Sequence, residues 1–386
     1  MENLAPAYAA NLASDVYDVK STLLRETFKK IYKNDFLMSE GESLKGKTGA
    51  FLFLKSEHTM GVAACGINEY EGHAIVALKG TASGFDALTD LNAGIKRFVT
   101  GGEVHQGFYY TFQSFLPDLD SFIKSLPPSI HTIHCVGHSL GGALATLVAD
   151  YLRKVSSRRT KLYTFGSPRV GLQFFAEGSA RRLGRDNIFR VYHKTDPVPM
   201  VPTWPFMHVP DGGPGDILLN SGLALNPAAY HKMGNYIKSI SAGETKGNWD
   251  ALRRLRPRPN LTRSVEQWLE ADGVISLTLS TAQLAGDAVM WVVKKVAELA
   301  GISLVMTGST AFTILDRLAI LMQRAYEFGK TVSHWVMRLI KRLAQLIGIV
   351  ITETTNITLN LIRTIFIRMH KAVSELVLRA GRYNEQ

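Results

Sequence analysis

Short apolar, β-rich runs separated by segments of helical spacing dominate the first two-thirds of this 386-residue chain. The runs cover residues 61–67, 73–80, 131–137, 161–166 and 187–193. Strands that alternate with helices predict a mainly parallel sheet with helices on both faces. Because the runs are apolar on successive residues, we expect the strands to be buried on both sides. The sequence therefore predicts an α/β fold.

The last third of the chain has a different character. Residues 241–263 are basic and contain Pro257 and Pro259, which break regular structure, so we expect a linker there. Residues 264–386 show strong helical periodicity. A content of 46% apolar and 20% charged residues excludes a disordered chain. We predict a first domain over 1–240, a basic linker over 241–263 and an added all-α domain over 264–386.

The most informative motif is Gly137-His138-Ser139-Leu140-Gly141, which follows a predicted strand and opens a predicted helix. In this context G-x-S-x-G is a nucleophile elbow, a tight turn that exposes the serine oxygen and to which the two glycines give room. The helix N-terminus behind the serine supplies N–H groups for a developing oxyanion. We therefore expect Ser139 to be a nucleophile, against the alternative of a chance glycine–serine turn.

A serine nucleophile needs a base and a group that orients the base. In chains with this elbow, the acid and then the histidine follow the serine. Asp196 lies just beyond the last predicted strand and His231 opens a predicted helix, so we expect both to complete a triad with Ser139. His193 and His208 are the competing bases. His193 falls inside a predicted strand and His208 in a proline-rich loop, which favours His231.

The oxyanion needs backbone N–H donors from an earlier strand end and from the residue after the nucleophile. The strand predicted at 73–80 ends at Gly80, so we assign the two donors to Thr81 and Leu140. A β-turn without chemistry is the alternative for Gly80 and Thr81 when they are considered alone.

Several ordered blocks resemble the class 3 lipases, the α/β-hydrolase family that includes the fungal triacylglycerol lipases. LKGTAS at 78–83 is similar to the oxyanion-loop motif of that family, VHQGFY at 104–109 to its V-H-x-G-F block and VGHSLGGALA at 136–145 to its serine elbow. YTFGSPRVG at 163–171, DPVPMVP at 196–202 and the H-x4-Y spacing at 231–236 match later blocks. The resemblance covers residues 12–240.

This resemblance implies the α/β-hydrolase fold and hydrolysis of lipid carboxylic esters through an acyl-enzyme, with no metal or cofactor. It identifies the same catalytic triad, Ser139, Asp196 and His231. Among lipid esters we favour a phospholipase of the A type, because the basic tail suits an anionic bilayer and a lid tryptophan is missing. A triacylglycerol or monoacylglycerol lipase is the alternative.

The sequence departs from the family at three places. Asp86 and Ala87 stand where the family carries Asn-Trp, so we do not expect a lid anchored by an indole ring. Lys79 replaces the usual arginine before the oxyanion glycine, and Leu172 replaces the asparagine after P-R-V-G.

Between the predicted acid and base, the chain carries Trp204, Phe206 and Met207 in a stretch rich in proline and glycine. Two alternatives are open for these side chains: they line a groove for an acyl chain, or they are ordinary loop packing.

The net charge is 44 − 33 = +11, and residues 241–386 hold 19 − 12 = +7 of it. Helical patterns at 288–300, 331–348 and 357–379 place basic residues opposite apolar ones. Basic amphipathic helices either lie on anionic membranes or pack as a bundle, and both alternatives are open. The uncharged stretch 299–315 is shorter than the ~20 residues of a membrane span. A further alternative is a membrane-perturbing or partner-binding tail that dominates the function, and no nucleic-acid partner is expected.

The opening residues carry Glu2 early and lack the basic start and apolar core of a signal peptide. We therefore expect production in the cytoplasm, peripheral association with a membrane, and delivery as an effector by a non-classical route with a neutralising or chaperone protein. The two cysteines, Cys65 and Cys135, lie in predicted strands, so we expect buried reduced thiols.

Overall fold

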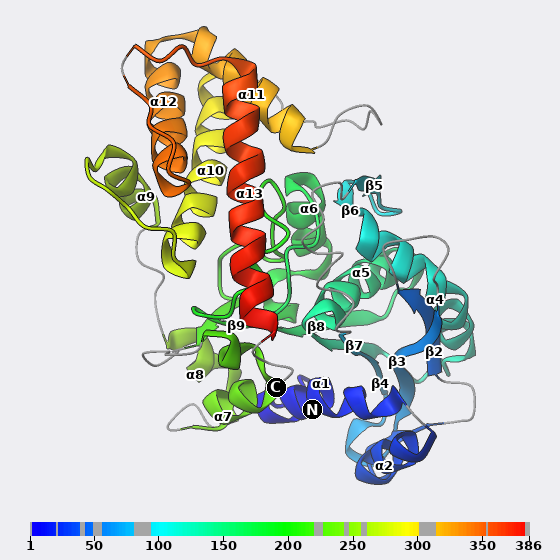
Figure 1. Ribbon diagram of the computed structural model, residues 1–386. Helices are drawn as coiled ribbons and strands as arrows, with labels where there is room; N and C mark the ends of the chain where they lie inside the picture. Colours follow the sequence, from blue (N-terminus) through cyan, green and yellow to red (C-terminus); the bar gives the residue numbers. More distant parts are fainter. Residues whose placement is uncertain are drawn as a thin grey trace.

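The structure of the chain is a computed structural model that describes residues 2–20, 22–38, 43–48, 56–80, 94–219, 227–242, 247–255, 261–300, 314–352 and 354–382. Figure 1 shows a sheet flanked by helices in the first two-thirds of the chain, and a group of long helices beside it formed by the last third.

One main sheet lies at the centre of the first two-thirds of the chain. Its strands are β1 (Phe36–Leu37), β2 (Ser43–Thr48), β3 (Ser56–Gly66), β4 (His73–Leu78), β7 (Thr132–His138), β8 (Arg159–Phe165), β9 (Ile188–His193) and β10 (Asp216–Leu219), and β5 (Ile95–Arg97) and β6 (Glu103–His105) form a separate pair. The strand order is β1-β3-β4-β7-β8-β9-β10, with β2 also paired to β3. The pairs from β4 to β10 are parallel, whereas β3 is antiparallel to β1, β2 and β4. The predicted mainly parallel sheet is confirmed.

Every apolar run predicted as a strand forms one, as β3, β4, β7, β8 and β9. Successive side chains of a strand point to opposite faces. In β4, for example, Val76 packs into one core and Ile75 into the other. Burying a side chain of this size contributes roughly 1.5–3 kcal/mol, so the doubly buried strands explain why the runs are apolar on successive residues.

Helices cover both faces of the sheet, as predicted. On one face lie α4 (Gln106–Ser125), α5 (Leu140–Val155) and α6 (Gln173–Leu183), and on the other lie α1 (Pro6–Asp15), α2 (Thr22–Tyr32) and α7 (Met233–Ser241). Short 3-10 turns, η1 (Val16–Lys20), η2 (Asn68–Tyr70), η3 (Arg185–Asn187), η4 (Val198–Met200) and η5 (Pro227–His231), connect them. Cys135 is buried in β7, whereas Cys65 in β3 is only partly buried, and both thiols are free.

The apolar stripes of the C-terminal helices pack on one another. These helices are α9 (Leu261–Glu270), α10 (Leu279–Ala300), α11 (Ile314–Phe328), α12 (Lys330–Leu346) and α13 (Leu359–Arg382). Contacts join α11 to α12 and α13, and α10 to α9 and α12. The α12 positions Val336, Leu339, Ile340 and Leu343 are fully buried. The structure therefore supports the bundle alternative, because stripes buried in a bundle are not presented to a lipid surface.

Membrane crossing finds no support in the helices that the structure describes, since none combines the length and the hydropathy that a span needs. Most of the uncharged stretch 299–315 lies outside the described residues.

Part of the predicted linker packs against the sheet. Helix α8 (Trp249–Arg254) lies within it, and the Trp249 Nε1–H donates to the Leu4 carbonyl over 2.7 Å. The Arg253 guanidinium lies 4.8 Å from the ring centre of Phe189 in β9. This part of the predicted linker therefore contributes to the core. The division of the chain into domains stays a prediction.

The helical bundle also contacts the first two-thirds of the chain. Helix α13 runs from the bundle down to the part of the chain that carries η4 and η5, and packs on both turns (Figure 1). The Thr203 Oγ1 and His370 Nδ1 atoms lie 2.6 Å apart across this contact. On α10, Lys294 Nζ lies 3.9 Å from a carboxylate oxygen of Asp211.

Candidate active site

Ser139 occupies a strained turn between β7 and α5. Its φ is 57° and its ψ is −132°. A residue other than glycine with such a φ costs of order 1–3 kcal/mol and persists only where its surroundings hold it. Here the Ser139 N–H donates to the Phe165 carbonyl over 3.0 Å, and the Ser139 carbonyl accepts from the Gly142 N–H over 2.9 Å. The serine is therefore fixed by the end of β8 and by the first turn of α5.

The glycines of the elbow are required by close backbone approach. A Cβ atom on Gly137 would lie 2.2 Å from the Gly141 carbonyl oxygen, and a Cβ atom on Gly141 would lie 2.2 Å from the Leu78 carbonyl oxygen. Real Cβ atoms do not come so close to backbone, so only glycine allows the start of α5 to lie against the end of β4.

The structure brings Ser139, His231 and Asp196 together. His231 Nε2 lies 3.0 Å from Ser139 Oγ, and His231 Nδ1 lies 2.9 Å from Asp196 Oδ2. Asp196 follows β9 and His231 ends η5, so two separate loops supply the acid and the base. The exposed fractions are 5% for Ser139, 6% for His231 and 2% for Asp196. The three side chains form one buried, connected set of hydrogen bonds.

The carboxylate of Asp196 is held by more than the histidine. The Tyr236 hydroxyl donates to Asp196 Oδ2 over 2.6 Å, and the Val198 N–H donates to Asp196 Oδ1 over 2.9 Å. Burial alone would raise the pKa of this carboxyl group, but His231, Tyr236 and Val198 favour its charged form and lower the pKa below its ordinary value. The carboxyl group of Asp196 is therefore ionised at neutral pH.

His138 buttresses the loop that carries the base. The His138 Nε2–H donates to the His231 carbonyl over 2.8 Å, because a carbonyl can only accept, and the His138 Nδ1 then accepts from the Tyr17 hydroxyl over 2.8 Å. Burial, together with the neighbouring His231, lowers the pKa of His138 to about 3, so this ring is neutral. The Tyr17 hydroxyl also hydrogen-bonds to the backbone of Gly80.

One predicted oxyanion donor is placed by the structure and the other is not. Leu140 is the first residue of α5, where backbone N–H groups have no partner inside the helix. Thr81 lies outside the described residues. Gly80, directly before it, lies beside the nucleophile, since a Cβ atom on Gly80 would be 3.2 Å from the Cβ of Ser139. The chain therefore leaves β4 next to Ser139, and the role of both donors stays a prediction.

The competing histidines occupy other surroundings. His193 is buried at the end of β9, and its ring centre lies 4.6 Å from that of Tyr236 and 5.0 Å from that of Tyr230. His208 is buried in the loop that follows. The ring that contacts the serine oxygen is that of His231.

The large apolar side chains of the loop between Asp196 and His231 are packed in a core. Trp204, Phe206 and Met207 are buried at 2–3% exposure and belong to the same core as the apolar faces of α10 and α13. The groove alternative is therefore not supported in this conformation. Asp86 and Ala87, which stand where the family carries Asn-Trp, lie outside the described residues.

Three residues around the triad were not assigned from the sequence. Tyr17 comes from the N-terminal region and Tyr236 from α7, and Gly166, with a φ of +53°, directly follows β8. A Cβ atom on Gly166 would lie 2.5 Å from Asp196 Oδ2. The H-x4-Y spacing contained Tyr236, but nothing in the sequence alone linked Tyr17 to the site.

In the part of the chain that the structure describes, no group of three or more His, Cys, Asp or Glu residues is arranged to hold a metal ion.

Comparison with known proteins adds a family to this geometry. The family model of the class 3 lipases, "Lipase (class 3)", matches residues 75–206. A curated relative, "Secreted mono- and diacylglycerol lipase 1" of Fusarium solani, is 36% identical over 153 residues, 37% of this chain and 45% of its own length. "Toxin TseL" of Vibrio cholerae is 34% identical over 129 residues, 32% of this chain and 19% of its own length. The chain thus spans about half the length of the Fusarium relative, and less of the toxin.

Among solved structures, the nonglycosylated LIP2 lipase of Yarrowia lipolytica is 22% identical, with a TM-score of 0.41, and the match covers 55% of this chain and 78% of that one.

The expected cytoplasmic location is wrong. Relatives from Fusarium, Gibberella and Penicillium are named as secreted lipases, which points to secretion. The expectation rested on the composition of the opening residues, which does not report where a protein acts.

The family match contains both the strained serine turn and the loop that bears Asp196, and it ends before His231. The order and surroundings of these elements agree with the blocks quoted from the sequence. Over residues 75–206, about a third of its length, this chain matches the family model of the class 3 lipases.

Proposed function

We propose that the chain hydrolyses carboxylic esters of lipids, with Ser139 as nucleophile, His231 as base and Asp196 as the acid that orients the base. The observation that carries the proposal is the unbroken line of hydrogen bonds from Ser139 Oγ through the His231 ring to Asp196, at 3.0 and 2.9 Å. Nucleophilic catalysis by serine needs these contacts in this order. The family match over residues 75–206 supports the same reaction.

The reaction follows the geometry of the site. His231 Nε2 takes the proton of the Ser139 hydroxyl while Oγ attacks the ester carbonyl, whose oxygen becomes an oxyanion. The N–H of Leu140 and, by prediction, that of Thr81 receive this oxyanion. His231 then gives its proton to the departing alcohol and leaves an acyl group on Ser139. Water deprotonated by His231 attacks the acyl-enzyme, and the fatty acid leaves with the serine hydroxyl restored.

Asp196 stabilises the imidazolium that forms in each half of the reaction. Its oxygen faces Nδ1, so it fixes the tautomer that leaves Nε2 free to accept the serine proton. Tyr236 and Val198 hold the two carboxylate oxygens, which prevents the acid from turning away as the charge on His231 changes. His138 holds the carbonyl of His231 from the other side.

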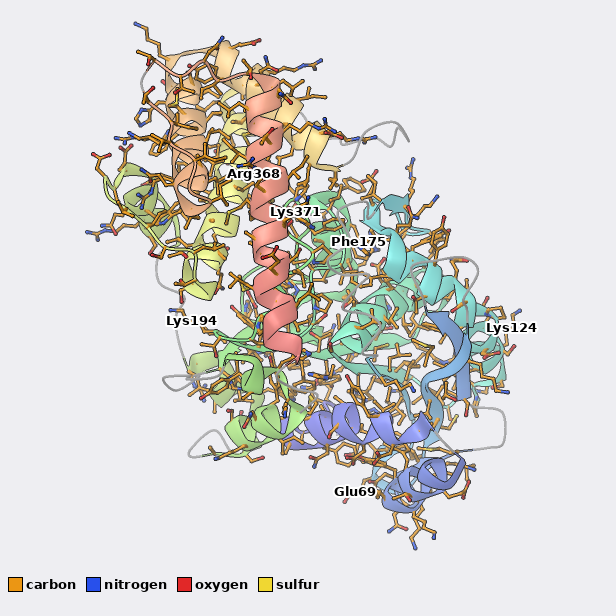
Figure 2. The ribbon with its side chains drawn as sticks, in the orientation of Figure 1. Glu69, Lys124, Phe175, Lys194, Arg368 and Lys371 are labelled. Atoms are coloured by element: carbon orange, nitrogen blue, oxygen red, sulfur yellow. The ribbon has the colours of Figure 1, made fainter. Side chains whose placement is uncertain are left out.

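Among lipid esters, mono- and diacylglycerols are our first substrate candidates, because relatives carry that substrate in their names. Phospholipids, cleaved as by an A-type phospholipase, are the second. The basic side chains Arg368 and Lys371, exposed along α13, favour them (Figure 2). A basic side chain near an anionic lipid surface contributes about 1 kcal/mol, so contact with such a surface is electrostatic in this proposal.

The test is product analysis by mass spectrometry with defined diacylglycerol, triacylglycerol, phosphatidylcholine and phosphatidylglycerol. We expect fatty acid release from one or more of them by the full chain, and none by Ser139→Ala. Equal release by the two proteins would refute the nucleophile, and the distribution of products among the four lipids decides between the two substrate classes. Thermal unfolding of Ser139→Ala checks that the variant is folded.

A role as an antibacterial or virulence effector, with a neutralising protein in the producing cell, is a second proposal, supported by the likeness to "Toxin TseL". Export of the full chain to the bacterial periplasm should reduce viability, whereas export of Ser139→Ala should not. Equal toxicity of the two proteins would instead assign the damage to the helical tail.

A further inference from the structure

The serine of the candidate site is nearly closed to solvent. Ser139 has an exposed fraction of 5%, and its base and acid are equally buried. A lipid ester must bring its carbonyl carbon to about 3–3.5 Å from the attacking oxygen, with an acyl chain on one side and an alcohol on the other. A site with this burial has to open before such a substrate can react.

Helix α13 lies over the two loops that supply the acid and the base. It packs on η4, which begins two residues after Asp196, and on η5, which ends at His231. The hydrogen bond between Thr203 and His370 ties the helix to the first of these loops, and both side chains are buried. The last helix of the chain is therefore fastened to the same loops whose positions set the triad.

The face that α13 turns toward the loops is apolar. Phe366, Met369 and Val373 are buried in one continuous core with Met200 of η4 and Trp204 of the following loop. Removal of these three side chains would expose an apolar floor that includes Met200 and Trp204, a surface suited to an acyl chain. Helix α13 and a hydrocarbon chain can therefore cover the same apolar floor, one at a time.

The seam between α13 and the loops also contains buried polar atoms that make no hydrogen bond in this structure. They are the Nε2 of His105, the Nε1 of Trp204 and the Oγ of Ser374, which lies one turn after His370 on α13. His105 adjoins the seam through its contact with Phe206. An unsatisfied buried polar group costs free energy. The seam is consequently weaker than an apolar core of equal size, as a contact that has to open requires.

We infer that α13 is a displaceable cover: docked, it closes the approach to Ser139, and its displacement by the acyl chain of the substrate opens the site. The inference rests on the proposed function of Ser139. In the closed form the triad is assembled but unreachable, so the rate of any reaction at Ser139 is proportional to the small open population. Loosening the seam raises that population.

The first test compares His370→Ala and Thr203→Val with two controls in the full chain. The readouts are the rate at which a fluorophosphonate probe labels Ser139 and the turnover of a short soluble p-nitrophenyl ester. Loss of one buried hydrogen bond shifts an equilibrium roughly tenfold, so both variants should react about tenfold faster than the parent. Glu375→Ala, on the exposed face of α13, should match the parent. Leu339→Ala, inside the bundle, controls for general loss of stability.

Folded seam variants that react at the parent's rate would overturn the cover. So would an equal acceleration by Leu339→Ala, since it would assign the effect to loosening of the whole bundle. If the parent shows no labelling and hydrolyses esters as Ser139→Ala does, the proposed function itself fails. If labelling requires Ser139 but is no faster in the seam variants, the inference about α13 fails and the proposed function stands.

A second test needs no substitution. The parent is phosphonylated at Ser139 with a methyl phosphonate or with a long-chain alkyl phosphonate, and deuterium uptake is followed in residues 359–382. Only the long-chain adduct should increase uptake in α13, because only its chain competes for the floor beneath the helix, while α12 serves as the internal reference. Equal uptake in the two adducts would refute displacement by an acyl chain.

Discussion

The Tyr236 hydroxyl donates a hydrogen bond of 2.6 Å to Oδ2 of Asp196, the same oxygen that faces His231. The phenol also accepts a hydrogen bond of 3.3 Å from the His193 N–H at the end of β9. The acid is thereby connected to the sheet through a side chain of α7, although it lies in a loop.

Replacing Tyr236 with phenylalanine removes this donor and should weaken catalysis. A hydrogen bond to a charged group is worth about 1.5–3 kcal/mol, so kcat/KM should fall roughly 10- to 100-fold. The loss of a donor to the carboxylate also raises the pKa of Asp196. Tyr151→Phe, which removes a tyrosine–carboxylate contact to Asp120 away from the site, is the control. An unchanged kcat/KM in folded Tyr236→Phe would contradict this role.

Gly166→Ala should abolish hydrolysis. The residue has a φ of +53°, and an added Cβ would lie 2.5 Å from Asp196 Oδ2 and 3.1 Å from His231 Nδ1. The acid or the base must therefore shift by several tenths of an ångström. Gly234→Ala, in α7, has no atom within 4 Å of its new Cβ and should leave the rate unchanged while stabilising the helix by about 0.5–1 kcal/mol. Steady-state rates and thermal unfolding of both variants check this, and comparable activity in the two would be the contrary result.

Acid should destabilise the fold through its buried neutral histidines. Burial, and then the neighbouring His370, lowers the pKa of His105 to about 4. Between the ordinary pKa of 6.5 and the folded-state pKa of about 4, the unfolded chain binds a proton at His105 that the folded chain does not bind. The free energy of unfolding therefore falls as the pH falls from 6.5 to about 4. Each such group costs about 1.4 kcal/mol per pH unit.

His105→Asn isolates this effect. His105 caps α4 by accepting the Gly107 N–H, and asparagine is an equally good cap. Urea unfolding between about pH 7 and pH 5 should show a smaller loss of stability in His105→Asn than in the parent, by roughly 1–2 kcal/mol. Asn248→Ala, which removes the cap of α8 and no titrating group, should keep the parent's pH dependence. Parallel curves for His105→Asn and the parent would rule the histidine out.

Trp249→Ala tests whether α8 belongs to the core. The ring is buried at 7% exposure, contacts the rings of Phe189 and Tyr163, and donates to the Leu4 carbonyl. Truncation of a buried tryptophan costs about 3–5 kcal/mol, which urea unfolding would register as a lower midpoint. Asp250→Ala, next to it and 70% exposed, should cost little. If the two variants unfold alike, this segment is a linker after all.

The sequence pattern predicts the inner strands of the sheet but not its edge strands. Residues 73–80, 131–137 and 187–193 are apolar throughout because neighbours cover both their faces, and that pattern is local. In contrast, β2 is the polar stretch Ser43–Thr48, and β10 is only Asp216–Leu219, so neither shows a periodicity that marks a strand. Their strand form depends on pairing with β3 and β9, which no local pattern contains.

The residues of the candidate site likewise divide into those that a local sequence pattern predicts and those that it does not. Ser139 is marked by glycines that the turn requires, and these lie within four residues of one another. Tyr17 meets His138 across a sequence distance of 121 residues, and no spacing rule connects them. Whether the helices pack as a bundle, and whether the aromatic loop is packed in a core, depends on tertiary contacts, since a helix such as α12 has the same amphipathic pattern whatever covers its apolar face.

The strand order has a consequence for how such a site can diversify. Ser139 follows β7 and Asp196 follows β9, with β8 between them, so two strand spacings, roughly 10 Å, separate their points of departure. The His231 ring bridges the gap that remains between their side chains. The spacing of the strands therefore sets how far apart the segments that carry Ser139 and Asp196 leave the sheet. Insertions in other loops around the site can therefore fit it to another ester without changing the strand spacing that separates Ser139 from Asp196.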